Sequence, residues 1–129
     1  MSAWRWIGRD VVFAIHDVQL AQHGGLDGVK DMHAIASAHA RPQQLHAYGD
    51  PPPDVFDLAA SYGFGFARHH GFSDGNKRTA WVLARLFLAD NGVTIQFTPH
   101  DAIQAMLGVA AGTLAEQAFA DWLRVRRVP

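Results

Sequence analysis

The sequence of 129 residues contains no cysteine, so disulfide bonds and thiolate metal sites are excluded. It has no uninterrupted run of about 18 apolar residues, and no membrane-spanning helix is therefore predicted. The N-terminal segment MSAWRWIGRD lacks a long apolar run behind a basic start, so we expect no secretory signal and a cytoplasmic location. The formal net charge is −1, which argues against a broad nucleic-acid-binding face.

Length and composition predict one globular domain covering residues 1–129. A chain of this size buries about 65–70% of the surface that its unfolded form exposes, which is enough for a stable hydrophobic core without disulfide bonds or structural metals. Apolar residues make up 49% and charged residues 18%, a balance typical of globular proteins. The three prolines at 51–53 form the one linker-like stretch, and they are too few to separate two domains.

Hydrophobic periodicity and turn residues predict an all-α fold. The six expected helices cover 8–23, about 27–40, a segment from Pro53-Asp54 through His70, about 75–90, a segment from Thr98 to about Ala111, and a last one that begins at Thr113. Val11, Ile15 and Val18 are expected on one apolar face of the first helix, with Val12 beside them. Residues 41–53 are predicted to be irregular or hairpin-like, because proline and glycine crowd their ends, and 93–97 alternate like a short strand.

Two of the expected helices, 54–70 and 75–90, are apolar on nearly all sides, which is typical of helices at the centre of a domain. The short link HGFSD makes them antiparallel neighbours. The fold prediction is therefore a compact six-helix bundle with a central antiparallel pair of buried helices. Thr98 is expected to cap the fifth helix, and Thr113 with Glu116 predicts a capping box for the sixth.

The stretch HHGFSDGNKRTAW (69–81) concentrates polar chemistry at the start of the second apolar helix. The first N–H groups of a helix lack internal partners and form an anion site, to which Lys77 and Arg78 add positive charge. Asp74 is a natural Mg²⁺ ligand beside bound phosphates, and His70 is suited to take a proton from a hydroxyl near neutral pH. A base, a metal ligand and an anion cradle are the parts that phosphoryl or nucleotidyl transfer uses.

Each of these residues also has an ordinary structural interpretation when it is taken alone. A lone loop histidine such as His70 usually faces solvent, and Asp74 alone is more often a helix N-cap than a metal ligand. Lys77 and Arg78 alone would be a solvated helix start, and Phe72 is expected to anchor the loop in the core. The functional interpretation therefore depends on the convergence of these side chains in space.

The pattern His-x-Phe-x-Asp-x-Asn-Lys-Arg at residues 70–78 resembles the signature of the Fic/Doc (Fido) superfamily. Most of that superfamily carries a Gly-Asn-Gly-Arg version and transfers AMP to protein hydroxyls, whereas the variant with Lys77 is similar to the Doc (death-on-curing) toxins. The segments HDVQLAQHGGLDG (16–28) and FLADNGV (87–93) are also Doc-like. The resemblance covers about residues 8–125.

The resemblance implies a six-helix toxin of a type II toxin–antitoxin module, restrained by a Phd-like antitoxin. It also implies a protein kinase that uses ATP and Mg²⁺ to phosphorylate elongation factor Tu on a threonine, which stalls translation. By position, His70 would be the general base, Asp74 the Mg²⁺ ligand and Arg68 an accessory residue. The ATP phosphates would be bound by Gly75, Asn76, Lys77 and Arg78.

Two features depart from common patterns of that superfamily. Gly75 stands where Doc-type motifs often have alanine, and glycine belongs to the AMP-transferring branch, so protein adenylyltransferase activity is the alternative. The self-inhibitory pattern Ser/Thr-x-x-x-Glu-Gly/Asn is absent, since Gly112 lies four positions before Glu116. Inhibition is therefore expected from an antitoxin whose disordered tail folds on binding, in the groove between the first two helices and the active site.

The connection at 41–50 corresponds by position to the family's flap, which aligns the extended backbone of the target. Residues 43–48 are expected to offer strand-like pairing, and a plain surface loop is the alternative. Two other functional alternatives are an inactive Fido binding module, which would not need His70, and a metal hydrolase built on the eight histidines. No two of these histidines have the i, i+4 spacing of a helical metal site.

Overall fold

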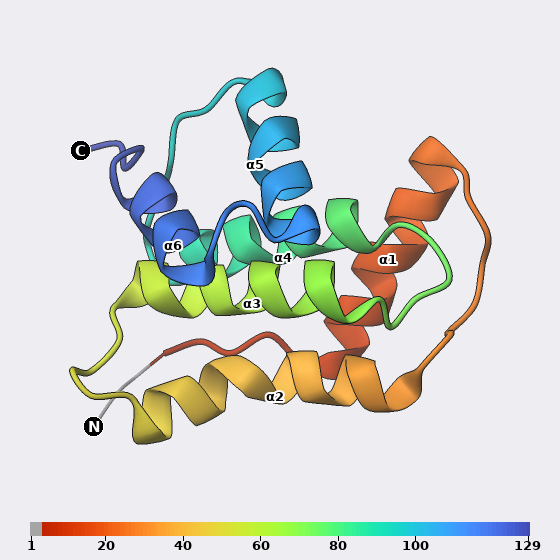
Figure 1. Ribbon diagram of the computed structural model, residues 1–129, viewed down its shortest axis with the longest axis horizontal. Coiled ribbons are helices and arrows are strands. Elements are labelled where there is room, and N and C mark those ends of the chain that lie inside the picture. The colour runs from red at the N-terminus through yellow and green to blue at the C-terminus, as the bar shows by residue number, and fades with distance from the viewer. Residues whose placement is uncertain (1–3) are drawn as a thin grey trace.

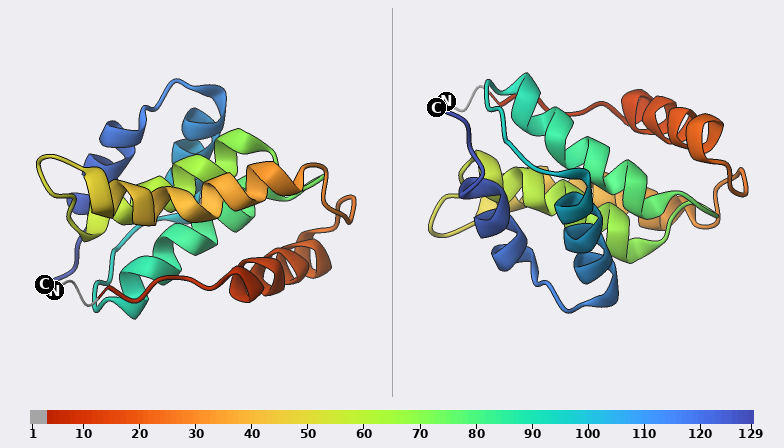
Figure 2. Two further views of the ribbon diagram at one scale, coloured as in Figure 1. Left: turned by 90° about the horizontal axis from the view of Figure 1, so that it is seen from below. Right: turned by 90° about the horizontal axis from the view of Figure 1, so that it is seen from above.

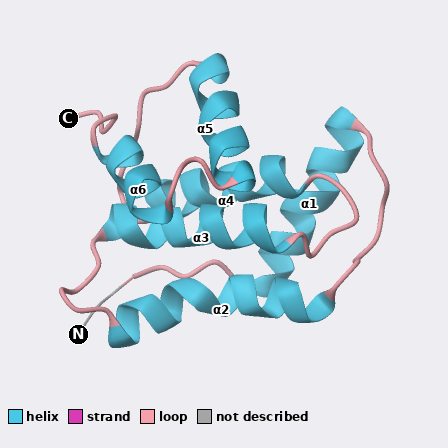
Figure 3. Cartoon of the chain, in the orientation of Figure 1, coloured by secondary structure: helices cyan, strands magenta, loops and turns pink. Residues whose placement is uncertain are grey.

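The computed structural model describes residues 4–129, and within that range the chain forms six α-helices and no β-strand (Figure 3). The helices are α1 (Arg9–His23), α2 (Met32–Tyr48), α3 (Val55–His69), α4 (Asn76–Asp90), α5 (Pro99–Ala111) and α6 (Glu116–Arg124). The predicted all-α class with six helices is confirmed. None of the helices within this range has the length and apolarity that crossing a bilayer requires.

The predicted central pair of helices is α3 and α4. The α3 helix lies in the middle of the bundle and packs against α2, α4, α5 and α6, while α1 lies alongside α4 (Figure 1 and Figure 2). Both central helices bury large side chains, and Tyr62, Phe66, Leu83 and Phe87 are at most 3% exposed. A helix that is apolar all round has to lie where neighbours cover every side, so this position follows from the sequence.

Two glycines of α3 allow neighbouring helices to approach closely. A Cβ at Gly63 would lie 2.7 Å from Cε2 of Phe119 on α6, and a Cβ at Gly65 would lie 3.3 Å from Cα of Ala38 on α2. A glycine inside a helix costs about 1 kcal/mol relative to alanine, and the close packing offsets that cost. The α3 helix is thus held firmly by two neighbours before the chain reaches the polar corner.

The buried face of α1 differs by one position from the predicted face. Val12 and His16 are 0% and 2% exposed, whereas Val11 and Val18 are 37% and 49% exposed. The prediction for Val11 and Val18 was wrong because α1 packs against α4 and the loop before it, where His16 finds a polar partner. A search for helical periodicity that counts only apolar residues does not detect a buried histidine.

The α2 helix continues through residues 41–48, which were predicted to be irregular. Pro42 lies inside the helix with its side chain buried, and Arg41 forms an ion pair with Glu116 of α6 at 2.6 Å. These tertiary contacts hold the segment helical although proline lacks an N–H group. The prediction that residues 43–48 offer strand-like pairing was therefore wrong.

The caps of the last two helices match the sequence predictions in one case and not in the other. Thr98 caps α5 as predicted, by accepting a main-chain N–H of the first turn at 3.1 Å. Thr113 instead donates its hydroxyl to the carbonyl oxygen of Gly108 near the end of α5, at 3.3 Å. The predicted capping box of Thr113 and Glu116 was wrong, because the carboxylate of Glu116 pairs with Arg41.

The connections between helices contain isolated bridges. Ile95 pairs with Arg127, so the alternating segment 93–97 contributes one antiparallel bridge instead of the short strand that its pattern predicted. Val29, in the connection between α1 and α2, pairs with Phe72 in the link between α3 and α4. This second bridge brings the α1–α2 connection against the polar motif.

Candidate active site at the α3–α4 corner

The link between α3 and α4 begins with a histidine in a strained conformation. His70 directly follows α3 and adopts φ 50° and ψ 47°, the left-handed conformation that favours glycine. It is the one non-glycine residue with positive φ in the part of the chain that the structure describes. Such a conformation costs on the order of 1 kcal/mol and is frequent at functional sites, where the surrounding structure imposes it.

Phe72 and Asn76 fix the loop that follows His70. Phe72 is 1% exposed, so the prediction that it anchors the loop in the core is confirmed. The side chain of Asn76 closes the loop, because its Oδ1 accepts the N–H of Phe72 at 3.1 Å and its Nδ2 donates to the carbonyl oxygen of Phe72 at 2.9 Å. With its side-chain amide used in this way, Asn76 can offer its main-chain N–H to a ligand.

The first turn of α4 is open to a ligand. Gly75 is the N-cap residue, with φ 76°, and the first internal hydrogen bond runs from the Thr79 N–H to the Gly75 carbonyl oxygen at 3.0 Å. The N–H groups of residues 76–78 have no hydrogen-bond partner among the described residues. Unpaired N–H groups at the positive end of a helix dipole form an anion site.

Asp74 presents an ionised carboxylate next to this helix start. Its Oδ2 accepts the N–H of Leu26 at 3.2 Å, and its Oδ1 accepts the N–H of Gly75 at 3.0 Å. These two hydrogen bonds are the main reason that the pKa of Asp74 lies below its usual value, and the charges of Arg78 and Lys77 lower it further. Because Gly75 is the N-cap of α4, Asp74 is not the capping residue.

The donor set around Asp74 fits a Mg²⁺ ion that is bound together with phosphates. Mg²⁺ in proteins often uses one or two carboxylates and completes its shell with phosphate oxygens and water. A carboxylate has about four lone-pair positions, and two of those of Asp74 accept main-chain N–H groups. Nowhere in residues 4–129 do three or more His, Asp or Glu side chains form a group that could hold a metal ion by themselves.

Lys77 and Arg78 are exposed cations without carboxylate partners. Neither forms an ion pair within 4.0 Å in the described range, and the guanidinium of Arg78 donates to the Gly24 carbonyl oxygen at 3.4 Å. Cations in the first turn of a helix are unfavourable by about 0.3–1 kcal/mol, since the helix dipole is positive there. A bound anion would convert this repulsion into attraction.

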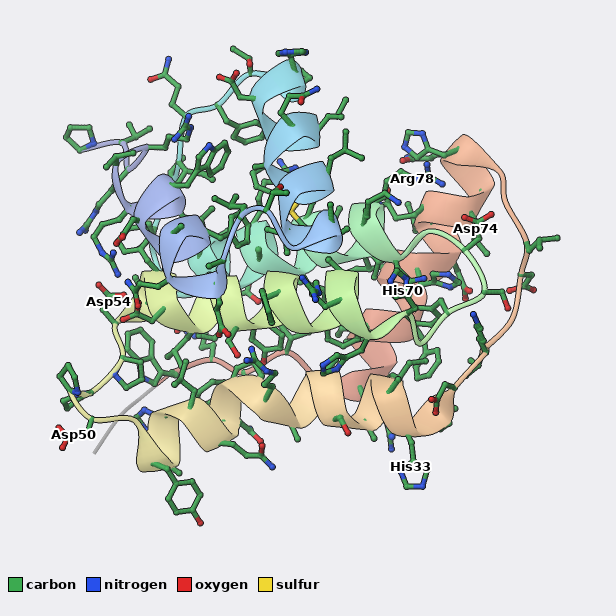
Figure 4. The ribbon with its side chains drawn as sticks, viewed as in Figure 1. His33, Asp50, Asp54, His70, Asp74 and Arg78 are labelled. Atoms are coloured by element: carbon green, nitrogen blue, oxygen red, sulfur yellow. The ribbon has the colours of Figure 1, made fainter. Side chains whose placement is uncertain are left out.

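The residues of the corner surround one cavity of about 210 Å³. It is lined by His70, Ser73, Asp74, Gly75, Asn76, Lys77 and Arg78. Six of the predicted site residues therefore lie together, and the labelled His70, Asp74 and Arg78 are found at the same end of the bundle (Figure 4). Ser73 was missed because it occupies an unspecified position of the motif, where residue type gives no signal.

Arg68 does not belong to this cavity. Its guanidinium carbon lies 5.6 Å from the centroid of the Phe64 ring on the same helix. A Cβ at Gly112, which follows α5, would lie 2.6 Å from Nη1 of Arg68. Arg68 thus lies against the end of α5, and it is the one predicted site residue that the structure separates from the others.

His16 is a second residue of the corner whose role the sequence reasoning missed. It was not among the predicted site residues, but it is 2% exposed, and its Nε2 lies 2.8 Å from the carbonyl oxygen of Asp74. The signal that could have found it is its spacing, since it follows the buried Val12 by four positions on the same helix.

Residues 24–31, between α1 and α2, run along the corner. The N–H of Ser73 donates to the carbonyl oxygen of Gly28 at 3.1 Å, and the N–H of Lys30 donates to the carbonyl oxygen of Gly71 at 2.9 Å. Non-helical backbone that pairs with the motif loop is therefore found here, and not in the region predicted for the flap.

A larger groove of about 610 Å³ adjoins the corner and shares Lys77 and Arg78 with it. It is formed by α1, α4, α5 and the segment before α5. Arg85 lies in this groove with its guanidinium carbon 5.5 Å from the ring centroid of Trp81 and 5.2 Å from that of Phe97. Its described lining residues include three permanent cations and no acid, although the whole chain carries a net charge of −1.

Comparisons with known proteins point to the same segment of the chain. The sequence model of the Fic/DOC family matches residues 6–88, which include the whole α3–α4 corner. The chain is 37% identical to "Protein kinase doc" of Escherichia phage P1 over 120 residues, which are 93% of this chain and 94% of that protein. It is 45% identical to "Toxin Doc" of Mycolicibacterium smegmatis over 73 residues, which are 56% of this chain and 55% of that protein.

Proposed function

This chain belongs to the Fic/DOC family, and we propose that it is a Doc-type protein kinase that transfers the γ-phosphate of ATP to a hydroxyl group of a protein. The observation that supports this most strongly is the convergence of His70, Asp74 and the uncapped start of α4 on one cavity. Phosphoryl transfer requires positioning and charge stabilisation more than covalent chemistry from the protein. The name of the phage relative, "Protein kinase doc", supports the same reaction.

In this proposal the phosphate chain is held by the first turn of α4. The free N–H groups of residues 76–78 donate to phosphate oxygens, and the side chains of Lys77 and Arg78 neutralise their charge. Asp74 would hold Mg²⁺, and the ion would supply positive charge beside the phosphates during transfer. The Leu26 N–H keeps the carboxylate of Asp74 oriented toward that role.

His70 acts as the general base. Its imidazole accepts the proton of the target hydroxyl while the hydroxyl oxygen bonds to the γ-phosphorus atom. The bond between that phosphorus and the β–γ bridging oxygen breaks, and ADP leaves. His70 lines the same cavity as the proposed phosphate-binding residues, which supports this role.

Protein adenylyltransferase activity is the alternative, and Gly75 was the residue that suggested it. The left-handed φ of 76° at this position gives a conformational reason for glycine that is independent of which phosphate is attacked. Lys77 occupies volume where the AMP-transferring branch has glycine, which favours a nucleotide bound with its γ-phosphate at the attack point. Lys77→Gly with α- and γ-labelled ATP tests this steric account, and unchanged phosphate transfer would count against it.

The family resemblance and the name "Toxin Doc" of the mycobacterial relative support a proposal for the target and the cellular role. The proposal is that the chain is the toxin of a type II toxin–antitoxin module and phosphorylates a threonine of elongation factor Tu in the cytoplasm. The test is mass spectrometry of a translation extract incubated with the chain and ATP–Mg²⁺. A mass gain of one phosphate on elongation factor Tu, lost in His70→Ala, supports the proposal, whereas an AMP adduct selects the alternative.

The antitoxin partner is expected in the groove between α1, α4 and α5. From the sequence, the partner was expected in the groove between the first two helices and the active site. The cavity that adjoins the corner is instead lined by α1, α4 and α5, and α2 does not contribute to it. Its apolar surface with Arg85, Lys77 and Arg78 suits a Phd-like tail that is acidic and apolar and folds on binding. Arg85→Glu should weaken binding of such a tail at least tenfold in calorimetric titration while ATP binding persists.

In this proposal, residues 24–31 align the extended backbone of the target, and residues 41–50 do not. Leu26 and Val29 are 71% and 41% exposed in a segment whose backbone already pairs with the motif loop. An extended target segment could add to such a backbone by main-chain hydrogen bonding and bring its hydroxyl to His70. Leu26→Asp should raise the KM for the protein target and leave the affinity for ATP without Mg²⁺ unchanged.

A further inference from the structure

His16 of α1 connects the N-terminal part of the fold to the motif loop. Resting on the proposed function, we propose that His16 is a positioning residue, which holds Asp74 where it can bind Mg²⁺ and keeps the start of α4 open for phosphates. His16 lies 58 positions before Asp74 in the sequence and does not line the cavity. Any effect on the reaction therefore acts through the loop.

The ring of His16 lies against three residues of the loop. It stacks on the ring of Phe72 with centroids 3.7 Å apart and planes 10° apart. Its Nε2 lies 2.8 Å from the main-chain carbonyl oxygen of Asp74. Its ring also lies 3.6 Å from the place that a Cβ of Gly75 would occupy. One side chain thus supports the anchor, the metal ligand and the N-cap residue of α4.

The hydrogen bond defines which ring nitrogen of His16 carries a proton. A carbonyl oxygen can only accept, so Nε2 must be the donor. The bond joins α1 to the main chain of Asp74, while the Leu26 N–H holds the carboxylate of the same residue at 3.2 Å. Asp74 is consequently fixed at its backbone from one side and at its side chain from another.

Packing alone does not explain a histidine at this position. His16 is 2% exposed, and burying an imidazole is unfavourable unless its polar atoms are hydrogen-bonded. A phenylalanine would stack on Phe72 equally well, and it would lack the donor that reaches Asp74. The donor is therefore the property that separates a positioning role from a purely structural one.

Three variants separate the two roles. His16→Phe keeps an aromatic ring and removes the donor, whereas His16→Gln keeps an N–H donor on a side chain of similar reach. Val12→Ala removes buried volume one turn earlier on the same helix, and it serves as the control for general loosening of α1.

The first measurement needs no nucleotide. Amide hydrogen exchange of Leu26, whose N–H bonds to the carboxylate of Asp74, should accelerate at least tenfold in His16→Phe relative to Val12→Ala. His16→Gln should restore most of the protection. In nitrogen-15 spectra of the wild type, His16 should carry its proton on Nε2. Equal exchange of Leu26 in His16→Phe and in the wild type would overturn the proposal.

The second measurement compares ATP affinity with Mg²⁺ and with EDTA. Residues that support metal ligands typically change metal affinity about 10- to 100-fold, so His16→Phe should lose about tenfold in affinity for ATP with Mg²⁺. Affinity in EDTA should change much less, because the N–H groups of residues 76–78 remain. Equal losses in both conditions would overturn the positioning role. A wild type that binds no ATP would contradict the proposed function, and the exchange of Leu26 would still decide the role of His16.

Discussion

The two ends of α3 carry polar clusters that differ in how their charges are satisfied. At the N-terminal end, the guanidinium of Arg124 pairs with Asp54 at 3.0 Å and with Asp57 at 3.1 Å, and it also pairs with Asp121. Asp54 and Asp57 in addition form a reciprocal capping box, in which each carboxylate accepts the main-chain N–H of the other residue at 2.9 Å. Every charged group of this cluster has an internal partner.

The C-terminal end of α3 shows the opposite arrangement. Lys77 and Arg78 form no ion pair within the described residues, and the first turn of α4 has no side-chain cap. His70 holds a left-handed conformation that a glycine would adopt with less strain. Figure 4 shows Asp54 at one end of the bundle and His70 at the other. We call the cluster of Asp54, Asp57, Asp121 and Arg124, whose charges are paired, the closed end. We call the corner from His70 to Arg78, whose cations form no ion pair within the described residues, the open end.

The difference indicates what each cluster does. Internal ion pairs and caps contribute to stability, because they satisfy groups that would otherwise be left without partners. Unpaired cations and free N–H groups around a cavity reduce stability, and such a cost is typical of binding sites, where a ligand supplies the missing charge. Substitutions at the two ends should therefore have separable effects on stability and on activity.

The largest expected effect is the loss of activity at the open end. His70→Ala removes the proposed base and should lower the transfer rate about 10²–10⁴-fold, the range typical of general acid–base catalysis. Its melting temperature should stay close to that of the wild type, because the exposed His70 side chain forms no hydrogen bond or ion pair with the other described residues. A rate within threefold of the wild type in a phosphate-transfer assay would contradict the assignment of His70.

At the closed end, substitution should affect stability without affecting the reaction. Arg124→Ala leaves three carboxylates without their shared partner and should lower the free energy of unfolding by about 1–2 kcal/mol. Urea unfolding measures this change, and Arg127→Ala, at an exposed cation just after the same helix, is a matched control. Reduced kcat in a fully folded Arg124→Ala sample would show that the two ends are not independent.

Part of the acid sensitivity of stability should come from Asp54 in the cluster around Arg124. Burial favours the neutral acid of Asp54, but hydrogen bonds from the Arg124 guanidinium and the Asp57 N–H outweigh it and hold the pKa of Asp54 below its usual value. A folded pKa below the unfolded value of about 3.9 gives stability that is present above that value and is lost as pH falls through the folded pKa. Urea midpoints from pH 7 to pH 2.5 should fall less steeply below about pH 4 in Asp54→Asn than in the wild type. Parallel curves would rule out Asp54 as a source of this acid sensitivity.

The smallest expected effect is a gain in stability at the open end. His70→Gly relieves the left-handed strain and should raise the free energy of unfolding by about 0.5–1 kcal/mol, although glycine also makes the unfolded chain more flexible. The same variant should be as inactive as His70→Ala. Thermal melts of the two variants side by side measure the difference, and a lower melting temperature for His70→Gly would argue against strain at this residue.

The sequence predicts the central helices and the motif well because their signals are local. The apolar composition of α3 and α4 requires a central position, and the short link between them requires an antiparallel corner. The motif from His70 to Arg78 is contiguous, so its residues had to lie near one another once the corner formed. The structure adds that six of the predicted residues line one cavity, which a contiguous motif does not show by itself.

The predictions that failed depended on contacts between distant segments. Pro42 and its neighbours remain helical because α2 is held against α3 and α6, which its local sequence does not reveal. Glu116 leaves the expected capping box because Arg41 lies within reach. His16 is buried because Asp74 offers it a carbonyl oxygen from 58 positions away. In each case a polar group found a tertiary partner that periodicity does not encode.

The central claim is that the open corner binds a triphosphate at the first turn of α4. Amide spectra of the full chain titrated with ATP and Mg²⁺ test it directly, because each N–H of residues 76–78 reports on its own partner. The account predicts saturable shifts that are largest at these three amides and at Gly75, with resonances near Arg124 unchanged. Saturable binding whose largest shifts lie at the α2–α3 connection, or no binding at all, would contradict it.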